Sequence, residues 1–464
     1  MRLPFAFHTL RLAVRTAACA ICLAVAATDG LAAQRPITTG TSGQLIVPAS
    51  DSDAAIWPRV SLSTAINRTL TNSPTYASAV GLVRTAKSAQ RVAFGNYLPT
   101  FAASGLAAKS DQTFSTASAT TGTGSPTVIR AYGAGVAMTL PIFTGGFRGA
   151  VRRETEALSY AAGAGLVLQR FANQFVATQG YLEVGRSHEL IRVGESAVAV
   201  AAKGLSYART MQQAGTVTPA DVLQAQFALA TAQRQLLAAR DTLIISAAAL
   251  GRLVGADGPV DVEPLANADP TPLALSDSAI LVAAMLDAPA VRQAEAQAGA
   301  FAASVGTAKA LYWPWLTATA DYNRSNNGAL LGAPRNGWYY AVGFTWPLFT
   351  GWQRADSVVR TTVNAQVAAV VAKDTRRLSG AQARQFLASL RLAEQSVTLA
   401  LEEIRVTTEN LRVMTVRYRA GVATILDLLT SQQFVIQASL DLVTARYSYL
   451  ETRASLVALL GREL

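Results

Sequence analysis

Two long stretches of the sequence contain no proline, one from Gly146 to Gln213 and one from Gly351 to Arg419. Proline inside a helix removes a backbone hydrogen bond and clashes with the preceding turn, so its absence permits one uninterrupted helix in each stretch. At a rise of about 1.5 Å per residue, such a helix is on the order of 100 Å long, and a globular domain cannot contain it. The hydrophobic content of 51% with only 7% aromatic residues is typical of closely packed helices.

The expected helices carry a packing pattern, because apolar residues recur at alternating steps of four and three as in coiled coils. In the second proline-free stretch these positions are Phe386, Leu390, Ala393, Val397, Ala400, Ile404, Thr407, Leu411 and Met414. After it they are Leu426, Leu429, Gln433, Ile436, Leu440, Val443, Tyr447, Leu450 and Ala454. Large residues alternate with alanine or threonine, which favours tight antiparallel contact between long helices.

A second stripe with a seven-residue step is basic. It consists of Arg377, Arg384, Arg391, Arg405, Arg412 and Arg419, with Thr398 in the remaining place. Three interpretations fit this pattern: the stripe forms a solvated outer face, lines a groove between subunits, or faces a water-filled interior.

Each proline-free stretch is followed by a glycine, a threonine and an aspartate at three-residue spacing. These residues are Gly215, Thr218 and Asp221 in the first copy and Gly421, Thr424 and Asp427 in the second. The spacing predicts the tip of a helical hairpin. The glycine takes the left-handed conformation that ends one helix, the threonine caps the next, and the aspartate reaches back to free backbone N–H groups. Capping alone accounts for both aspartates.

The two tips belong to a duplication that covers most of the chain. They lie 206 positions apart, and the same offset relates Arg148 to Arg354 and Pro141-Ile-Phe-Thr-Gly to Pro347-Leu-Phe-Thr-Gly. One constant offset through three motifs indicates tandem repeats. Each repeat is expected to contain a helix, at about 59–94 or 276–310, then two strands and a long helical hairpin.

The expected organisation starts with a signal peptide at 1–33, which has a basic start, an apolar segment and small residues at its end. The protein is therefore expected to leave the cytoplasm. The remaining parts are an extended arm at 34–58, a first repeat at 59–255, a polar linker at 256–275 and a second repeat at 276–464.

Four strand-like segments alternate in polarity, at about 98–110, 128–142, 313–325 and 336–349. One face of the last segment carries Trp338, Tyr340, Val342, Phe344 and Trp346. A lipid-exposed barrel strand needs such a face, but a strand of a soluble sandwich has the same alternation. Four strands cannot close a barrel, and open strand edges are not tolerated in lipid, so several chains would have to share one barrel. A small soluble sheet is the alternative, but it would leave the long helices with nothing to pack on.

Little in the sequence points to catalysis. Both cysteines, Cys19 and Cys22, lie in the predicted signal peptide, and the later histidine, His188, stands alone in a helical pattern and is expected at the surface. No metal-ligand cluster, nucleophile elbow or phosphate loop accompanies it. We therefore expect no enzyme, no metal and no cofactor. The formal net charge of +11 is spread along the helices, which argues against nucleic acid as a partner.

Together, these features resemble the TolC family of outer-membrane channel proteins over about residues 59–461. The most specific pieces are the two tips, the Pro-x-Phe-Thr-Gly turns and the Leu-Gly-Arg endings at Leu250-Gly251-Arg252 and Leu460-Gly461-Arg462. The resemblance implies a mainly α protomer with a β part, made of long coiled-coil helices and four antiparallel strands. Three such chains would form one 12-stranded β-barrel in the bacterial outer membrane and a periplasmic α-helical tunnel.

The resemblance also implies a function and partners. The homotrimer would export drugs or, as in type I secretion, proteins, and it would do so passively. It would dock to a periplasmic adaptor (membrane fusion) protein and an inner-membrane pump of the ABC or RND type, with outer-membrane lipid around its barrel. A periplasmic coiled-coil tether or scaffold without a pore is the alternative function.

Finally, the resemblance implies a gate at the tips. Asp427 takes the place of an aspartate that forms a ring around the opening, and Tyr418 that of a tyrosine that latches onto Asp221. Thr430 and Ala423 stand where the family prototype has a second ring aspartate and a latch arginine, so the closed state is expected to be looser or less cation-selective. The tip turns expected to meet the adaptor are marked by Gly215, Thr218, Gly421 and Thr424.

Overall fold

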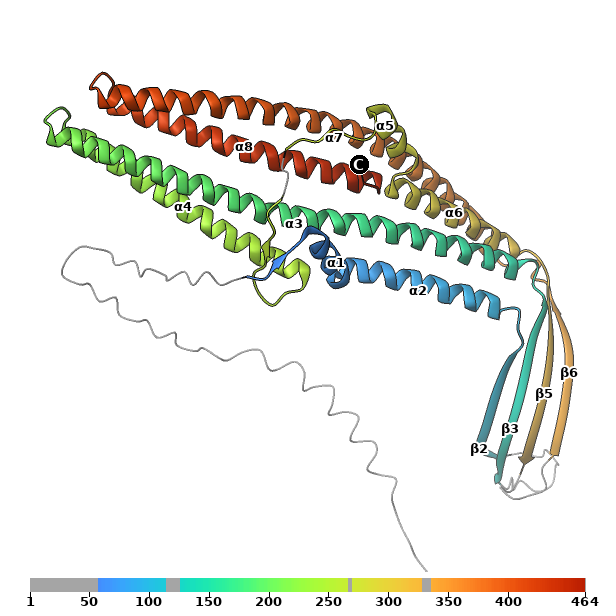
Figure 1. Ribbon diagram of the computed structural model, residues 1–464. Coiled ribbons are helices and arrows are strands. Elements are labelled where there is room, and N and C mark those ends of the chain that lie inside the picture. The colour runs from blue at the N-terminus through green and yellow to red at the C-terminus, as the bar shows by residue number, and fades with distance from the viewer. Residues whose placement is uncertain (1–56, 114–125, 266–268, 328–334, 464) are drawn as a thin grey trace, which may run out of the picture. The chain divides into compact units, whose positions relative to one another are not determined.

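Each proline-free stretch is one uninterrupted helix in the computed structural model of the protein (Figure 1). The structure describes residues 57–113, 126–265, 269–327 and 335–463, which belong to one unit, Ile56–Leu464. The predicted signal peptide and nearly all of the predicted arm lie outside the described residues. None of the described helices has an apolar stretch long enough to cross a membrane.

The two long hairpins are the main helical elements. Helices α3 (Phe147–Gln213) and α7 (Gln353–Arg419) have 67 residues each. Each turns back through a tip into a helix of 36 residues, α4 (Pro219–Val254) or α8 (Ile425–Leu460). Corresponding helices begin and end 206 positions apart, as the repeated tips require. The expected long helices are therefore confirmed.

The helix that opens each repeat is interrupted, which corrects the expectation of single helices at 59–94 and 276–310. The observed helices are α1 (Leu62–Asn72), α2 (Pro74–Gly95), α5 (Asp277–Leu286) and α6 (Pro289–Ala310). Each break lies directly before a proline, Pro74 or Pro289. A proline disfavours the helical conformation of the residue before it, so the first helix ends there and a new one begins at the proline. Ser73 is accordingly extended and accepts a hydrogen bond from the backbone N–H of Tyr76 at 3.3 Å, which caps α2.

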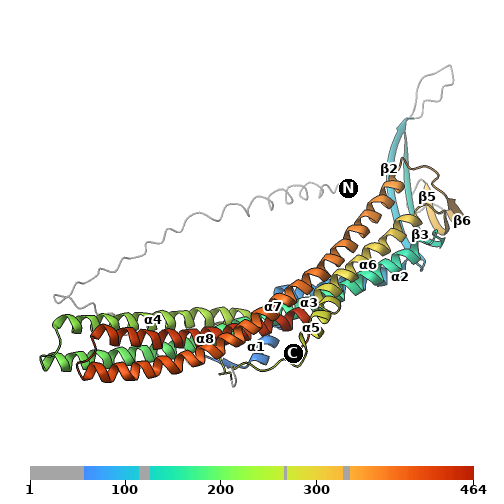
Figure 2. The same ribbon diagram turned by 90° about the horizontal axis from the view of Figure 1, so that it is seen from above.

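The long helices contact one another in the order α7, α8, α3, α4 (Figure 1), and the view from above shows both tips at the same end (Figure 2). Helices α3 and α8 form the inner pair, and α4 and α7 lie at the two edges of this layer. Glycines allow the inner pair to approach closely. A Cβ at Gly204 would lie 2.7 Å from Nε2 of Gln432, and one at Gly185 would lie 3.0 Å from the Tyr447 hydroxyl oxygen.

The predicted seam of α7 is buried or half-buried throughout, whereas the seam of α8 needs a correction near the tip. Leu426 is 66% exposed, and Gln433 is also exposed. The residues facing inward there are Ile425, Leu428, Ser431 and Gln432. The reason is that the helix cap sets the rotation of the first turn, and a strict step of 3.5 residues drifts against a helix of 3.6 residues per turn.

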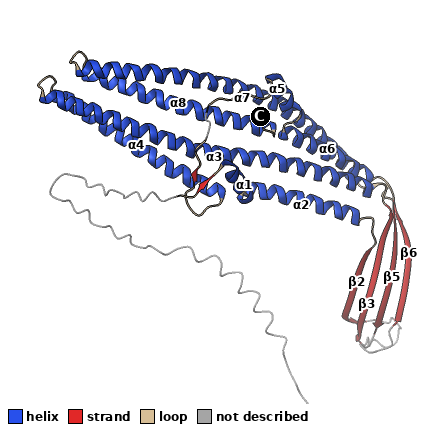
Figure 3. Cartoon of the chain, in the orientation of Figure 1, coloured by secondary structure: helices blue, strands red, loops and turns tan. Residues whose placement is uncertain are grey.

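The four strands form one antiparallel sheet at the opposite end of the helices from the tips (Figure 3). The strands are β2 (Thr100–Thr113), β3 (Pro126–Phe143), β5 (Trp315–Asn327) and β6 (Arg335–Thr345), in the order β2-β3-β5-β6. The register places Ala103 opposite Val136, Val136 opposite Tyr322, and Tyr322 opposite Trp338. Because side chains alternate between faces, the apolar faces of the four strands coincide.

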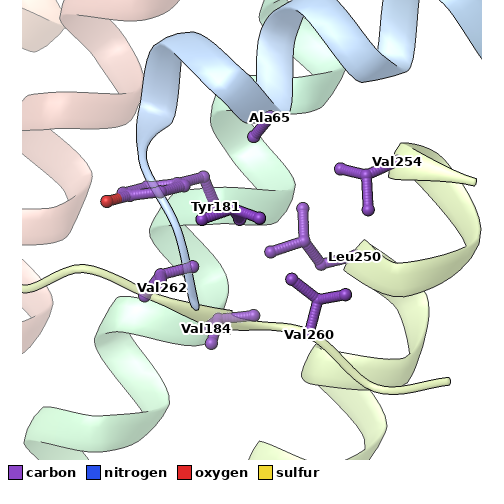
Figure 4. Packing of buried hydrophobic residues seen from close by; sticks show 8 residues of the cluster. Ala65, Tyr181, Val184, Leu250, Val254, Val260 and Val262 are labelled. Carbon is purple, nitrogen blue, oxygen red and sulfur yellow. The ribbon is translucent and has the colours of Figure 1, made fainter. Parts of the chain in front are cut away.

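A second, very small sheet includes part of the predicted polar linker at 256–275. Strand β1 (Arg59–Val60) pairs in parallel with strand β4 (Asp261–Val262). Figure 4 shows the buried cluster around it, to which α1, α3, α4 and both strands contribute: Val60, Ala65, Tyr181, Val184, Leu250, Val254, Val260 and Val262. Strands of two residues have no periodicity, so the sequence could not reveal them.

The repeated Leu-Gly-Arg letters do not occupy equivalent places. Gly461 (φ 67°) ends α8, and its counterpart 206 positions earlier is Gly255 (φ 70°), which ends α4. Gly251 lies inside α4, where a Cβ would come within 2.1 Å of the Gly258 carbonyl oxygen. The first repeat therefore needs Gly251 for a close approach of the linker, and the second needs Gly461 for its backbone conformation.

Candidate functional site: the helical tips and the sheet

Both tips take the conformation that their sequence predicts. Gly215 has φ 76° and Gly421 has φ 74°, the left-handed region that glycine adopts without steric cost. At the first tip the N–H of Thr216 donates to the Met211 carbonyl at 3.0 Å, and at the second the N–H of Val422 donates to the Arg417 carbonyl at 2.9 Å. These bonds close the last turn of α3 and α7 and reverse the chain.

The two aspartates cap the returning helices. Asp221 Oδ2 accepts hydrogen bonds from the backbone N–H of Thr218 at 2.8 Å and from its hydroxyl at 2.9 Å. Asp427 Oδ2 accepts the equivalent bonds from Thr424 at 2.9 and 2.8 Å. The hydroxyl of Thr424 also accepts a bond from the Asp427 N–H at 3.2 Å, which completes a capping box. The capping role is therefore confirmed.

The tip itself lowers the pKa of Asp427. The backbone N–H of Thr424, then its hydroxyl, donates to the carboxylate, and these bonds hold the pKa of Asp427 below its usual range. The positive charge of Arg417 adds to this effect. A ring of Asp427 carboxylates from several copies would raise the pKa of each, because like charges repel. Capping opposes that rise and helps to keep such a ring charged.

Tyr418 does not form the expected latch with Asp221. Its side chain is 1% exposed and its hydroxyl has no hydrogen-bond partner within the described residues. Burial, and then the nearby charge of Asp221, raises the pKa of Tyr418, but the Asp221 carboxylate bonds to Thr218 instead. The ring packs between the two hairpins in a cluster made of Leu205, Ala208, Val222, Ala225, Ile425 and Leu428. Tyr418 thus joins the tips through apolar packing.

A second contact between the hairpins was not expected from the sequence. The guanidinium of Arg419, the last residue of α7, lies 5.5 Å from the ring centre of Tyr207 on α3. A cation over an aromatic face is attracted by the ring's negative centre. Arg419 is the last residue of the predicted arginine stripe, but nothing in the sequence connects it with Tyr207.

The rest of the arginine stripe is exposed and largely matched within the chain. Arg405 pairs with Glu402 at 2.6 Å, and Arg412 pairs with Glu409 at 2.7 Å. Arg391 pairs with Asp277 at the start of α5. Partners three residues away on a helix are typical of a solvated face. A solvated outer face, a groove between subunits and a water-filled interior would all be exposed in a single chain, so the three interpretations stay open.

The remaining predicted tip residues are accessible in the single chain. Thr430, Gly215 and Gly421 are exposed, Ala423 is half-buried, and no atom of another residue lies within 4 Å of a Cβ placed on either glycine. The turns therefore leave room for another helix to approach. Contact with an adaptor remains a prediction.

His188 is partly exposed, as the sequence suggests, but it is not isolated. Its Nε2 lies 2.6 Å from Oδ1 of Asp261, and Asp261 Oδ2 accepts a bond from Arg59 at 3.2 Å. Burial raises the pKa of Asp261, but the bonds from His188 and from the Val262 N–H outweigh it and hold the pKa below its usual value. This group fastens the small β1–β4 sheet to α3. No cluster of three potential metal ligands occurs among the described residues.

Equivalent arginines secure both turns between the sheet and the long helices. Arg148 donates to the Pro141 and Ile142 carbonyls at 2.8 Å each, and its guanidinium lies 4.7 Å from the ring centre of Tyr97. In the second repeat Arg354 donates to the Leu348 carbonyl at 3.0 Å and lies 4.8 Å from the ring centre of Tyr312. The repeated arginine of the duplication thus has a structural role, which its spacing alone did not reveal.

Solved structures share this architecture. The outer membrane protein VceC from Vibrio cholerae has a TM-score of 0.70 at 20% identity, with 87% of this chain and 96% of VceC covered. The Campylobacter jejuni CmeC outer membrane channel has a TM-score of 0.74 at 18% identity, with coverage of 86% and 85%. At these identities the likeness shows a common fold.

Sequence relatives agree with the fold. Protein CyaE of Bordetella pertussis is 29% identical over 298 residues, 63% of this chain and 62% of CyaE, so the match spans less than two thirds of that relative. The model of the family described as outer membrane efflux protein matches residues 65–256 and 280–462, which include both repeats. The chain belongs to the outer membrane efflux protein family, a family of transport proteins and not of enzymes.

Proposed function

We propose that the chain is one protomer of a trimeric outer-membrane channel that lets drugs or secreted proteins leave the cell passively. The observation that carries the proposal is that the sheet and the helical layer both end in edges that lack a partner within the described chain. Copies of the same chain fit both edges. The tandem repeats and the family membership support this interpretation.

The sheet is incomplete by itself. Its outer strands β2 and β6 each pair on one side only among the described residues. Hydrocarbon does not tolerate unpaired backbone groups, so a sheet in the membrane must continue into strands of other copies. Pairing β6 of one copy with β2 of the next preserves the strand order. Three copies then give the 12 strands that the family resemblance implies.

One face of the sheet suits lipid. The five predicted lipid-facing residues are between 52% and 70% exposed in the single chain: Trp338, Tyr340, Val342, Phe344 and Trp346. The Trp338 ring lies 4.6 Å from that of Tyr322 and 6.1 Å from that of Tyr340, measured between ring centres, so these three aromatics share a face. A continuous exposed apolar face marks an interaction surface and matches the outward face of a membrane barrel.

The edges of the helical layer also lack partners. Helix α7 exposes apolar residues at seven-residue steps: Leu392, Leu399, Val406 and Val413. Helix α4 does the same at Leu223, Leu237 and Ile244, with the small Ala230 between them. Such stripes form the seam of a coiled coil when two helices meet. Packing α7 of one copy against α4 of the next would close the layer into a tunnel.

The tips would close the periplasmic end of this tunnel. Asp427 lies at the first turn of α8, and three copies around an axis would place three carboxylates near one opening. Such a ring attracts cations and repels anions. The buried Tyr418 and the Arg419–Tyr207 contact hold the two hairpins of one chain together, so opening would require one hairpin to move against the other. The exposed turns would meet a periplasmic adaptor, which connects the channel to an inner-membrane pump of the ABC or RND type.

Two measurements test the proposal. The protein is purified from outer membranes in detergent, and its gel mobility is compared before and after boiling. Its conductance is then recorded in planar bilayers. We expect a heat-sensitive trimer and discrete channels, whereas a monomer without conductance would refute the proposal and favour the periplasmic tether. A tether would leave the apolar face of the sheet in water, which argues against it.

A further inference from the structure

The turn between β6 and α7 contains an exposed cluster formed by Leu348, Phe349 and Trp352. Their exposed fractions are 77%, 75% and 77%, among the highest of the large apolar residues in the described chain. Trp352 has φ 67°, and no other residue besides glycine has a positive φ within the described residues. This conformation is unfavourable for a side chain of that size, because the Cβ crowds the following carbonyl oxygen.

The matching turn of the first repeat has a less strained backbone. Gly146 occupies the position of Trp352 and has φ 81°. The aromatic residue comes one position later, at Phe147, which is half-buried and lies 5.4 Å from the ring of Trp315. The second repeat reverses this order, with Trp352 at the left-handed position and Gln353 after it. The second repeat therefore has neither a glycine at the left-handed position nor an aromatic residue packed inward directly after it.

Nothing within the described chain compensates for this arrangement. Trp352 contacts the ring of Phe349 edge-on at 6.2 Å between centres, but both rings remain mostly exposed. Strained backbone persists where the surroundings stabilise it, and it concentrates at functional contacts. Arg354 fixes the turn through its bond to the Leu348 carbonyl and its contact with Tyr312. The cluster is therefore fixed in an exposed position, which favours a contact with something outside the chain.

The position of the turn indicates the partner. The turn comes shortly after strand β6, which carries Val342 and Phe344 and is followed by Trp346, and α7 begins at Gln353 (Figure 1). In a protein of the outer membrane, this is the level at which the sheet leaves the hydrocarbon and the helices begin. Tryptophan favours that level, because its large apolar ring lies in the acyl boundary while its N–H reaches the headgroups.

We propose that Leu348, Phe349 and Trp352 anchor the second repeat in the headgroup region of the periplasmic leaflet. The first repeat has less exposed residues at the equivalent places, Ile142 at 47% and Phe143 at 48%, and it has a glycine in place of Trp352. The tryptophan anchor would therefore fix each protomer to the lipid surface at one of its two turns. The inference rests on the proposed membrane position of the sheet. It adds a lipid contact beyond the end of strand β6, at residues that are not among the five predicted lipid-facing ones.

The test uses single cysteines labelled with an environment-sensitive fluorophore in the full-length protein. The native cysteines, Cys19 and Cys22, lie in the predicted signal peptide, so an introduced cysteine is the labelling site of the exported protein. Trp352→Cys reports on the anchor, and Phe349→Cys reports on it with Trp352 still present. Val342→Cys, on the proposed lipid face, and Thr398→Cys, on the exposed middle of α7, are the controls. Each variant is placed in phosphatidylethanolamine–phosphatidylglycerol vesicles and quenched by lipids with a nitroxide near the headgroup, and separately by aqueous iodide.

We expect the labels at 352 and 349 to be quenched by the nitroxide lipid at least threefold more than the label at 398, and the label at 398 to respond to iodide. If the labels at 352 and 349 behave like that at 398 while the label at 342 contacts lipid, the anchor is refuted and the membrane sheet stands. Shielding of both turn labels from lipid and iodide would assign the cluster to a neighbouring copy and would also refute the anchor. If the label at 342 is not quenched by lipid, the membrane position of the sheet fails, and the anchor fails with it.

Discussion

The α3–α4 and α7–α8 hairpins have the same lengths and the same turn geometry, but they have different surroundings. Helix α3 lies inside the layer, and glycines such as Gly185 and Gly204 bring it close to α8. Helix α7 lies at an edge and exposes Leu392 and Leu399, whereas the equivalent residues of α3, Arg186 and Val193, are half-buried. The difference shows that a duplicated segment keeps its local conformation, while its neighbours decide which face becomes core and which becomes interface.

The tips show the same division on a smaller scale. Both use glycine, threonine and aspartate in the same way, yet the second has a buried tyrosine, Tyr418, where the first has no aromatic residue. The residue 206 positions earlier is Gln212, which is exposed. The two tips therefore contribute unequally to their contact. The first contributes aliphatic side chains such as Leu205 and Val222, and the second adds the aromatic ring that packs on them.

The largest effect is expected from placing a charge on the exposed edge of α7. Leu399→Glu would put a carboxylate into the seam proposed between copies, where burial of an unpaired charge is costly. We expect at least a roughly tenfold loss of the heat-sensitive trimer on unheated gels. Thr398→Glu adds the same charge one residue away, within the arginine stripe, and should leave the trimer intact. Equal loss in both variants would show that charge alone disturbs assembly.

A substitution at the end of α4 tests a contact that the second hairpin lacks. Gly251→Ala would force a methyl group against the Gly258 carbonyl oxygen, which lies 2.1 Å from the ideal Cβ position. Overpacking of this kind costs about 1–3 kcal/mol, which exceeds the gain of about 0.5–1 kcal/mol from replacing glycine in a helix. Denaturant unfolding of the purified protein measures the loss. Gly258→Ala, which enters open space, should change the stability by less than about 0.5 kcal/mol.

Substituting the two capping aspartates one at a time distinguishes a role in gating from a role in capping alone. Asp427→Ala would remove the proposed ring charge, so we expect the single-channel conductance to rise about twofold or more and the preference for cations to fall. Asp221→Ala removes the equivalent cap from the first tip and serves as the control, with little change in ion selectivity. A similar change of selectivity in both variants would assign the effect to loss of a cap.

The cap of the second tip should also respond to pH. The hydrogen bonds from Thr424 lower the pKa of Asp427, so the cap stabilises the folded tip above the ordinary aspartate value of about 3.9. This stabilisation is lost as the pH falls through the lowered folded pKa. Amide hydrogen exchange at residues 424–428, corrected for its intrinsic pH dependence, should therefore accelerate as the pH falls below about 4. Asp427→Asn should remove most of this acceleration, and persistence of the full effect would point to another group.

The smallest effect is expected from Tyr418→Phe. Because the hydroxyl is buried without a hydrogen-bond partner, its removal should alter the stability by less than about 0.5 kcal/mol or increase it slightly. The conductance of the closed channel should also stay unchanged. A clear rise in conductance would show that Tyr418 bonds to Asp221 in the assembled channel, as the family resemblance implies.

The sequence by itself determined the local elements of this protein. Absence of proline specified two helices of 67 residues, and the spacing of glycine, threonine and aspartate specified both tips. Strand alternation specified which side chains share a face. These features depend on backbone geometry within a few residues, so they can be read from one chain. The resemblance added the family, which the match over both repeats confirmed.

The tertiary structure decided which of these surfaces meet. It buried Tyr418 where a hydrogen bond was expected, exposed Leu426, and brought His188 to Asp261, which lies 73 positions away. It also paired the two-residue strands β1 and β4 and placed Trp352, in a left-handed conformation, on the surface. Each outcome depends on how distant segments pack and on small rotations of long helices, and no spacing within a single helix or strand specifies either.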